Sequence, residues 1–195
     1  METNPRAGFF AHPTAVIEDG SAIGEGTKIW HFAHVRVNSS IGQRCTLGKS
    51  VFVDEGVHIG NDCKVQNGVS VYAGVTIEDK VFVGPNVTFT NDRWPRALSP
   101  SWEIEKTTLK VGCSIGANAT IICGTEIGSF AMVGAGSVVV RNVEDFELVA
   151  GNPARHIGWV CRCGRICSRD RDAPNSFECE LHGGPEAGLR EEPAK

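Results

Sequence analysis

Apolar residues recur at every sixth position over most of this 195-residue chain. An α-helix repeats its apolar face about every 3.6 residues and a half-buried strand every second residue, so a strict period of six fits neither alone. The pattern predicts a short strand, a turn and another short strand, many times over. The six-spaced residues are Ile17, Ile23, Ile29, Val35, Ile41, Leu47, Val53, Ile59, Val65, Val71, Ile77, Val83 and Phe89, then Leu109, Ile115, Ile121, Ile127, Val133 and Val139.

Three such hexapeptides close one coil of eighteen residues, and successive coils stack at the spacing of hydrogen-bonded strands, about 4.8 Å. The sequence therefore predicts an all-β, parallel β-helix with a continuous aliphatic interior. The hexapeptides resemble those of the left-handed parallel β-helix of the hexapeptide acyltransferases. The left hand follows from that resemblance, because the usual crossover rule favours the right hand.

The division of the chain follows the period and its breaks. Leu109 follows Phe89 by twenty residues, which is not a multiple of six and predicts an inserted loop at about 93–108. We expect an N-terminal arm at 1–10, the β-helix at 11–157, a small Cys-rich tail at 158–184 and disorder at 185–195. The glycine, proline and glutamate content of the last segment favours disorder.

Charge and hydropathy exclude several kinds of partner. The formal net charge is -4 and the pI about 5.9, so neither nucleic acid nor an anionic membrane is expected to bind. Residues 1–13 lack the pattern of a signal peptide and no eighteen apolar residues run together, which favours a cytoplasmic protein. Cys45, Cys63 and Cys113 occupy small-residue positions of the repeat and are expected to be reduced core residues.

Residues eighteen apart stack on one wall or edge of such a prism. Trp30 and Tyr72 stand where the repeat favours small or polar residues, so their rings are expected to project outward, towards a subunit interface or a flat ligand such as a nucleobase. Corner asparagines are common turn residues, and this structural role remains an alternative for each of them. The expected substrate-binding residues are Trp30, His31, Gln66, Asn67, Tyr72 and Asn86, with Arg93 and Arg96 of the loop.

Four stretches, 29–32, 65–72, 84–92 and 151–155, resemble the nucleotide-sugar 3-N-acetyltransferases. Among these, the chain is most similar to those that act on a UDP-linked 2-acetamido-3-amino-2,3-dideoxyuronic acid. The resemblance implies acetyl-CoA-dependent acetylation of the 3-amino group in surface polysaccharide (O-antigen) biosynthesis, by a homotrimer. A dTDP-linked 3-amino-3,6-dideoxyhexose is the alternative substrate, and a β-helix protein that is not an acyltransferase is a lower alternative. Arg93 or Arg96 would suit the carboxylate of a uronate.

The resemblance also implies where coenzyme A binds. Glycine lets a ligand approach the backbone closely, and glycines are frequent along the second run. The pantetheine arm is expected at Ala131, Gly134, Ala135, Gly136 and Ser137. The nucleotide end is expected at Arg141, Pro153 and Arg155, where arginine would pair with phosphate.

Acetyl transfer to an amine needs a neutral amine, an oxyanion donor and aligned reactants, so positioning supplies much of the acceleration. The resemblance implies that Asn91 lies beside the sugar amine, with the departing thiolate of CoA as the final proton acceptor. His31, His34 and His58 are the alternative bases, since many hexapeptide acyltransferases resemble one another in using histidine. Covalent catalysis by Cys123 is a minor alternative, because nothing in the sequence pairs this thiol with a base.

Composition changes sharply after Trp159. Three cysteines and a histidine form two short clusters, each followed by glycine, and three thiolates with one imidazole suit tetrahedral zinc. The sequence therefore predicts a structural zinc site, with an unliganded flexible tail as the alternative and Cys167 as a spare ligand. The expected ligands are Cys161, Cys163, Cys179 and His182.

Overall fold

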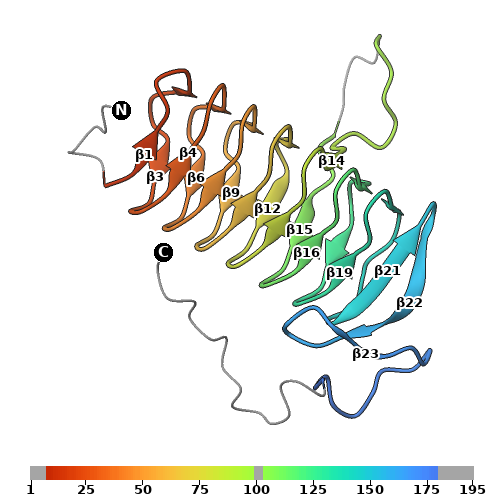
Figure 1. Cartoon of the computed structure of the whole chain (residues 1–195). Helices are drawn as coiled ribbons and strands as arrows, with labels where there is room; N and C mark the ends of the chain where they lie inside the picture. Colours follow the sequence, from red (N-terminus) through yellow and green to blue (C-terminus); the bar gives the residue numbers. More distant parts are fainter. Residues whose placement is uncertain (1–7, 99–102, 180–195) are drawn as a thin grey trace.

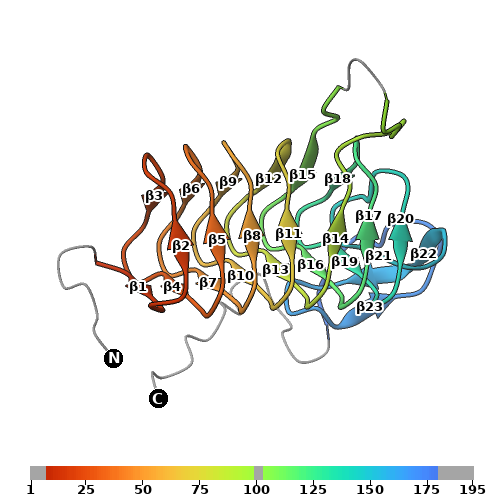
Figure 2. The same cartoon turned by 90° about the horizontal axis from the view of Figure 1, so that it is seen from above.

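The chain winds into a three-sided prism of stacked coils (Figure 1, and Figure 2 from above). The computed structural model describes residues 8–98 and 103–179. Over these residues the regular structure is all β, which confirms the fold predicted from the hexapeptides. No helix in the described part of the chain is long and apolar enough to cross a membrane.

The first sheet of the prism runs its whole length and then continues into a hairpin. Most of its coil strands pair in parallel at a spacing of eighteen residues, as in Lys28 with Thr46 and Lys64 with Phe82. Across the inserted loop the spacing is 32, as in Phe82 with Ser114. In spatial order within the described residues it comprises β1 (Phe10–Ala11), β4 (Lys28–Ile29), β7 (Thr46–Leu47), β10 (Lys64–Val65), β13 (Phe82–Val83), β16 (Ser114–Ile115), β19 (Met132–Val133), β21 (Glu147–Gly151), β22 (Ala154–Val160) and β23 (Ile166–Ser168).

The other two faces are parallel sheets with the same spacing of eighteen, again except across the inserted loop. The second sheet consists of β2 (Val16–Ile17), β5 (His34–Val35), β8 (Phe52–Val53), β11 (Ser70–Val71), β14 (Thr88–Phe89), β17 (Thr120–Ile121) and β20 (Val138–Val139). The third sheet consists of β3 (Ala22–Ile23), β6 (Ser40–Ile41), β9 (His58–Ile59), β12 (Val75–Ile77), β15 (Thr107–Leu109) and β18 (Glu126–Ile127). Each strand is short because the chain must turn about every six residues.

The six-spaced aliphatic residues fill the interior. From Ile29 to Val139 every one of them is buried, whereas Ile17 and Ile23 are only partly covered because they lie near the open N-terminal end. The column is stabilised by burial of apolar side chains that a single coil could not shield. Cys45, Cys63 and Cys113 lie in this core as free, buried cysteines, as the repeat predicted.

Two kinds of corner matter for function. The first corner joins the first sheet to the second and contains residues 30–32, 48–50, 66–68, 84–86, 116–118 and 134–136. The second corner joins the second sheet to the third and contains residues 72–74, 90–92 and 122–124. The first corner needs a positive φ at its last residue, which is 57° at Phe32, 58° at Ser50 and 57° at Asn86. Asparagine tolerates this conformation better than most residues.

A long loop leaves the prism between β14 and β15, where the period breaks (Figure 1). Backbone hydrogen bonds close its base, from Glu105 N to Asn91 O (3.2 Å) and from Thr107 N to Gly74 O (3.0 Å). Residues 99–102 of the expected loop lie outside the described residues.

The C-terminal end is closed by an antiparallel hairpin of β21 and β22, to which β23 adds (Figure 2). The strand β22 runs through the expected boundary between residues 157 and 158. The division of the chain into units therefore stays a prediction. Residues 1–7 of the expected arm at 1–10 and the expected disordered segment at 185–195 lie outside the described residues, and Phe10 of the expected arm belongs to β1.

Candidate active site

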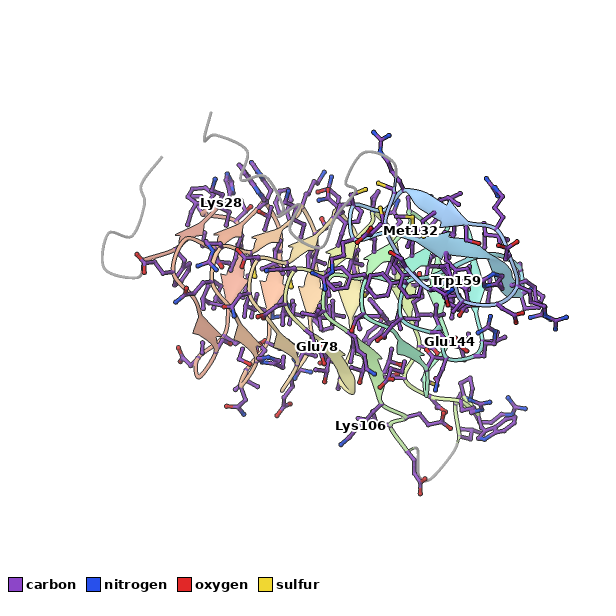
Figure 3. The ribbon with its side chains drawn as sticks, turned by 90° about the horizontal axis from the view of Figure 1, so that it is seen from below. Lys28, Glu78, Lys106, Met132, Glu144 and Trp159 are labelled. Carbon is purple, nitrogen blue, oxygen red and sulfur yellow. The ribbon has the colours of Figure 1, made fainter. Side chains whose placement is uncertain are left out.

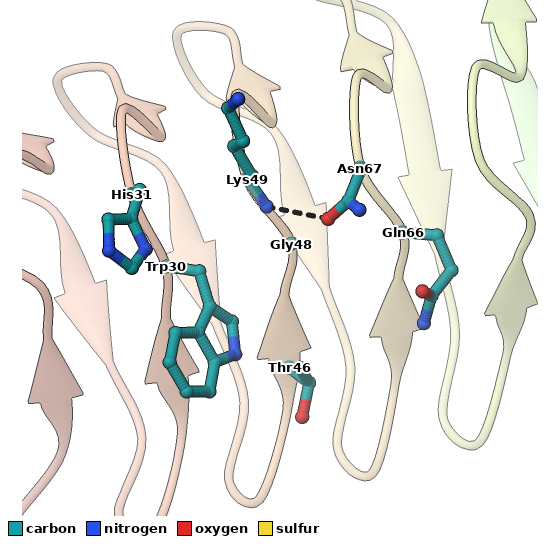
Figure 4. A pocket seen from close by; sticks show the side chains of 7 residues that line it. All are labelled: Trp30, His31, Thr46, Gly48, Lys49, Gln66 and Asn67. Carbon is teal, nitrogen blue, oxygen red and sulfur yellow. Dashed lines mark hydrogen bonds between the residues drawn. The ribbon is translucent and has the colours of Figure 1, made fainter.

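A groove of about 270 Å³ opens on the first corner of the prism, across the coils of β4, β7 and β10. Figure 4 shows the side chains that line it. Four of the expected substrate-binding residues, Trp30, His31, Gln66 and Asn67, lie together here. Thr46, Gly48 and Lys49 complete the lining.

The groove floor is built by Asn67. Its Oδ1 accepts a hydrogen bond from the backbone N–H of Lys49 (2.8 Å), drawn in Figure 4. A Cβ at Gly48 would lie 2.5 Å from that oxygen, so only glycine fits beside it. Asn67 thus has the structural role of a corner asparagine, and its Nδ2 is the donor that a ligand can use.

One end of the groove is aromatic. The rings of Trp30 and His31 are nearly parallel, with an angle of 5° between the planes and 6.2 Å between the centroids. His31 also stacks on His12 at 3.5 Å, and Phe10 meets Trp30 edge-on at 5.6 Å. Desolvation and the neighbouring His31 lower the pKa of His12, which limits positive charge at this end. The result is a flat, polarisable wall suited to a planar ring system.

Asn86 lies on the same corner, one coil beyond Asn67, but does not line the groove. Its backbone N–H donates to Asn67 O (2.9 Å), and its Oδ1 would lie 2.5 Å from a Cβ at Gly68. Asn86 therefore continues the ladder of corner asparagines.

Asn91 and Tyr72 lie on the second corner, so one chain does not bring them to the groove. Asn91 Nδ2 donates to the carbonyl of Ala73, one coil before it, at 3.4 Å. Tyr72 is 38% exposed and meets Phe52 edge-on, with 6.1 Å between the centroids. The second corner thus carries a hydrogen-bonded amide in one coil and a partly exposed aromatic ring in the coil before it.

The loop arginines also belong to the second corner. Arg93 Nη1 lies 3.4 Å from Glu105 Oε2 across the base of the loop, so this guanidinium already has a carboxylate partner. Arg96 is exposed and donates to the carbonyl of Pro95 (2.8 Å). Neither guanidinium is held in place by buried contacts that would orient it towards the carboxylate of a substrate.

The residues expected to hold pantetheine gather at the last turn of the first corner. Gly134, Ala135 and Gly136 form the turn itself, and a Cβ at Gly136 would meet nothing within 4 Å. The side chains of Ala131 and Ser137 point into the structure and are fully buried. Ser137 Oγ accepts a hydrogen bond from Gly151 N (3.1 Å), which ties this turn to the closing hairpin.

Arg141 is held by a buried carboxylate. Its Nη2 lies 2.7 Å from Glu147 Oε1, and His156 Nδ1 lies 3.2 Å from the same oxygen. Burial alone would raise the pKa of Glu147, but the bonds from Arg141 and from the backbone of Glu144 dominate and lower it. Arg141 thus has a structural partner. Pro153 and the exposed Arg155 lie at the hairpin turn, where Arg155 donates to the carbonyl of Ala154 (3.2 Å).

Three of the four expected metal ligands lie together. The Sγ atoms of Cys161, Cys163 and Cys179 are all within 4.8 Å of one another. Cys167 Sγ instead contacts the carbonyl of Trp159 at 3.4 Å. His182 lies outside the described residues.

Sequence reasoning missed the acceptor that orients one histidine. His34 Nε2 lies 2.7 Å from Glu18 Oε1, and Glu18 Oε2 accepts from the backbone of Val37 (2.9 Å). The spacing of sixteen between His34 and Glu18 is not a multiple of six, so the repeat gives no signal for it. His58 Nδ1 contacts Ser40 Oγ at 2.8 Å, one coil apart, as the eighteen-residue stacking predicts.

Comparison with known proteins points to a single family. The hexapeptide repeat of succinyl-transferase matches residues 39–73 and 111–141. The chain is 47% identical over 154 residues to the dTDP-3-amino-3,6-dideoxy-alpha-D-galactopyranose 3-N-acetyltransferase of Aneurinibacillus thermoaerophilus, covering 79% of this chain and 80% of that protein.

Two solved structures share the fold. A hexapeptide-repeat acetyltransferase of Vibrio cholerae, complexed with acetyl coenzyme A, is 25% identical with a TM-score of 0.56, covering 63% of this chain and 70% of that one. A GDP-perosamine N-acetyltransferase of Caulobacter crescentus, in complex with CoA and GDP-perosamine, is 24% identical with a TM-score of 0.51, covering 77% of this chain and 56% of that one. The second likeness shows the fold alone.

Proposed function

Because the chain belongs to the hexapeptide-repeat acyltransferases, we propose that it transfers the acetyl group of acetyl-CoA to the 3-amino group of a dTDP-linked 3-amino-3,6-dideoxyhexose. The observation that carries this proposal is the 47% identity to an enzyme named for that reaction, over four fifths of both chains. The solved Vibrio cholerae relative, which holds acetyl coenzyme A, supports the donor.

The site favours this 6-deoxy sugar over the UDP-linked uronate that the sequence resemblance first indicated. A uronate carboxylate needs a cation. Of the two arginines expected there, Arg93 is paired with Glu105 at 3.4 Å, and the exposed Arg96 is bonded to the carbonyl of Pro95 in its own segment. A carboxylate placed beside that pair would meet the like charge of Glu105, which destabilises binding. A 6-deoxy sugar has a methyl group at this position and needs no cation.

In the proposed reaction the neutral 3-amine attacks the thioester carbonyl. The C–N bond forms, the C–S bond breaks, and the CoA thiolate leaves and takes the amine proton, directly or through water. Asn91 orients the amine through its amide, which the bond to Ala73 O holds at the second corner. No step needs a strongly basic side chain, because positioning of the two reactants supplies most of the acceleration.

We propose that a homotrimer completes the site. The groove with Trp30, Gln66 and Asn67 lies on the first corner and Asn91 on the second, so a neighbouring copy has to bring the two together. Closed threefold packing of identical prisms would repeat that contact at each interface. Light scattering is expected to give three times the chain mass of 20.9 kDa.

Mixed trimers test the shared site. Asn91→Ala and Gln66→Ala chains are each expected to be nearly inactive alone. Co-expression of the two is expected to restore a fraction of the activity, because some interfaces then combine an intact groove with an intact Asn91. Mixtures no more active than the separate variants would contradict a site shared between chains.

A panel of acceptors tests the proposed substrate. The purified chain is assayed with acetyl-CoA and either dTDP-3-amino-3,6-dideoxygalactose, its glucose epimer, or a UDP-linked 2-acetamido-3-amino-2,3-dideoxyuronic acid. Thiol release gives the rate and mass spectrometry identifies the amide. We expect kcat/KM to be at least about tenfold higher for the dTDP sugars than for the uronate, about 1.4 kcal/mol. The opposite ranking would refute the proposed substrate.

A further inference from the structure

We propose that the thiolates of Cys161, Cys163 and Cys179 bind one zinc ion, which fastens the segment after β22 to the last coils of the prism. This site takes no part in the proposed acetyl transfer. Its function is structural, and the argument rests on two chain segments that meet although eighteen residues separate Cys161 from Cys179.

The first segment is a tight turn that presents two cysteines. Cys161 N donates to Arg165 O (2.9 Å) and Gly164 N donates to Cys161 O (2.8 Å), which closes the turn between β22 and β23. Gly164 has φ +82°, and a Cβ there would lie 2.9 Å from Met132 Cε on β19. Figure 3 labels Met132, which lies close to the C-terminal strands. The positive φ favours glycine in this turn, which packs against Met132.

The second segment is positioned by aromatic packing, not by the thiols. The ring of Phe177 stacks on Phe146 at 4.4 Å and lies 5.9 Å from Trp159. Phe146 stacks in turn on Phe130 at 5.3 Å, and the guanidinium of Arg162 lies 5.2 Å from the Phe130 centroid. These contacts bring Cys179, two residues after Phe177, to the turn that carries the other two cysteines.

One of the two sulfur–sulfur distances already suits a tetrahedral thiolate site, and the other requires a small movement of one side chain. Zinc–sulfur bonds of about 2.3 Å place two sulfurs of a tetrahedron about 3.8 Å apart. Cys163 Sγ and Cys179 Sγ are 3.7 Å apart. Cys161 Sγ and Cys163 Sγ are 2.8 Å apart, so the exposed Cys163 side chain has to turn outward by about 1 Å. The fourth position is left to water or another donor.

The chemistry of the set selects zinc. Thiolates are soft ligands that favour zinc over magnesium or calcium, and a thiolate at the buried Cys161 needs a neighbouring positive charge. The core cysteines differ, because Cys45 Sγ and Cys63 Sγ each donate to a backbone carbonyl at 3.0 Å, to Gly60 and Glu78. Those bonds need protonated thiols, so the core cysteines do not compete for the ion.

Metal analysis of the full chain is the test. After zinc loading and removal of loosely held metal, elemental analysis is expected to find about one zinc per chain in the wild type and less than about a tenth of that in Cys163→Ser and Cys179→Ser. Cys167→Ser is the matched control and is expected to retain the ion, because its thiol lies outside the cluster. Circular dichroism checks that each variant is folded.

A second measurement uses the wild type alone. Cobalt replacing zinc is expected to give the strong near-ultraviolet absorption of thiolate-to-cobalt charge transfer, and chelation of zinc is expected to lower Tm by several degrees. Absence of zinc from the loaded wild type, equal loss in Cys167→Ser, bound iron in its place, or a Cys161–Cys163 disulfide in protein kept under reductant would each overturn the proposal.

Discussion

The first corner of the prism differs sharply between its early and late coils. In the early coils it carries Trp30, His31, Gln66 and Asn67, whereas in the last coil it carries only Gly134, Ala135 and Gly136. The backbone is the same in both, with N–H to carbonyl distances of 2.8 Å at Gly48 and at Gly134. We propose that one repeating backbone serves two ligands here, by displaying side chains at one end and exposing the main chain at the other.

The largest expected effect comes from a residue outside that corner. Asn91→Ala is expected to lower kcat/KM by about 10²–10³-fold, the loss typical of one well-placed polar group in acyl transfer. His34→Gln and His58→Gln are expected to stay within about tenfold of wild type, since the proposed mechanism uses no protein base. Steady-state kinetics measures all three. A greater loss of kcat/KM in either histidine variant than in Asn91→Ala would contradict the proposed role of Asn91.

The ion pair near the C-terminal end of the prism is expected to contribute more to the stability of the fold than one in an early coil. Glu147→Gln is expected to lower the free energy of unfolding by about 2 kcal/mol at pH 7, because the 3%-exposed carboxylate binds Arg141 and a backbone N–H. Asp62→Asn, which breaks the exposed pair with Arg44 in an early coil, is expected to leave Tm nearly unchanged.

The pH dependence of the Glu147 effect follows from its lowered pKa. The carboxylate stabilises the fold above its ordinary pKa of 4.5, and this contribution is lost as pH falls through the lower pKa of the folded state. The difference between wild type and Glu147→Gln in denaturant unfolding should therefore shrink below about pH 4.5. A difference that stays constant into acid would show that Arg141 and Glu147 are not coupled.

The aromatic wall of the early coils gives a smaller effect. Trp30→Ala is expected to raise the KM for the nucleotide sugar by roughly tenfold, since stacking of a base on an aromatic ring is worth about 1–3 kcal/mol. The kcat and the KM for acetyl-CoA should stay within about twofold. Phe82→Ala is the control, because Phe82 is 39% exposed on the first sheet but does not line the groove. An equal rise of this KM in Trp30→Ala and Phe82→Ala would contradict binding of the nucleotide sugar in the groove.

The repeat made most of the fold predictable. Interior positions of every coil are sterically alike, so the spacing alone gave pairs such as Lys28 with Thr46, and the break after Phe89 gave the loop. The hairpin of β21 and β22 could not be predicted in the same way. The six-residue period ends at Val139, and the longer antiparallel strands that follow belong to no repeat.

Stacking also made the groove predictable, because Trp30, Gly48 and Gln66 are eighteen residues apart. Contacts between residues whose spacing does not follow the repeat could not be predicted from the sequence. Glu147 pairs with Arg141 from a strand outside the repeat, and Glu18 reaches His34 across a spacing of sixteen. The burial of Ala131 and Ser137 could also have been predicted, because they stand four residues after Ile127 and Val133, where the repeat places small core residues.

The division of the first corner into two binding regions can be tested by crossing two variants with two substrates. The KM values for acetyl-CoA and for the nucleotide sugar are measured in Gly136→Ala and in Trp30→Ala. Gly136 has φ +69°, a strained conformation for alanine that Phe32 and Asn118 nevertheless adopt at this corner, and a methyl group there would project into open space. With circular dichroism showing that Gly136→Ala is folded, we expect the KM for acetyl-CoA alone to rise in that variant, and the KM for the sugar alone to rise in Trp30→Ala. If the same KM rose in both variants, the account would be wrong.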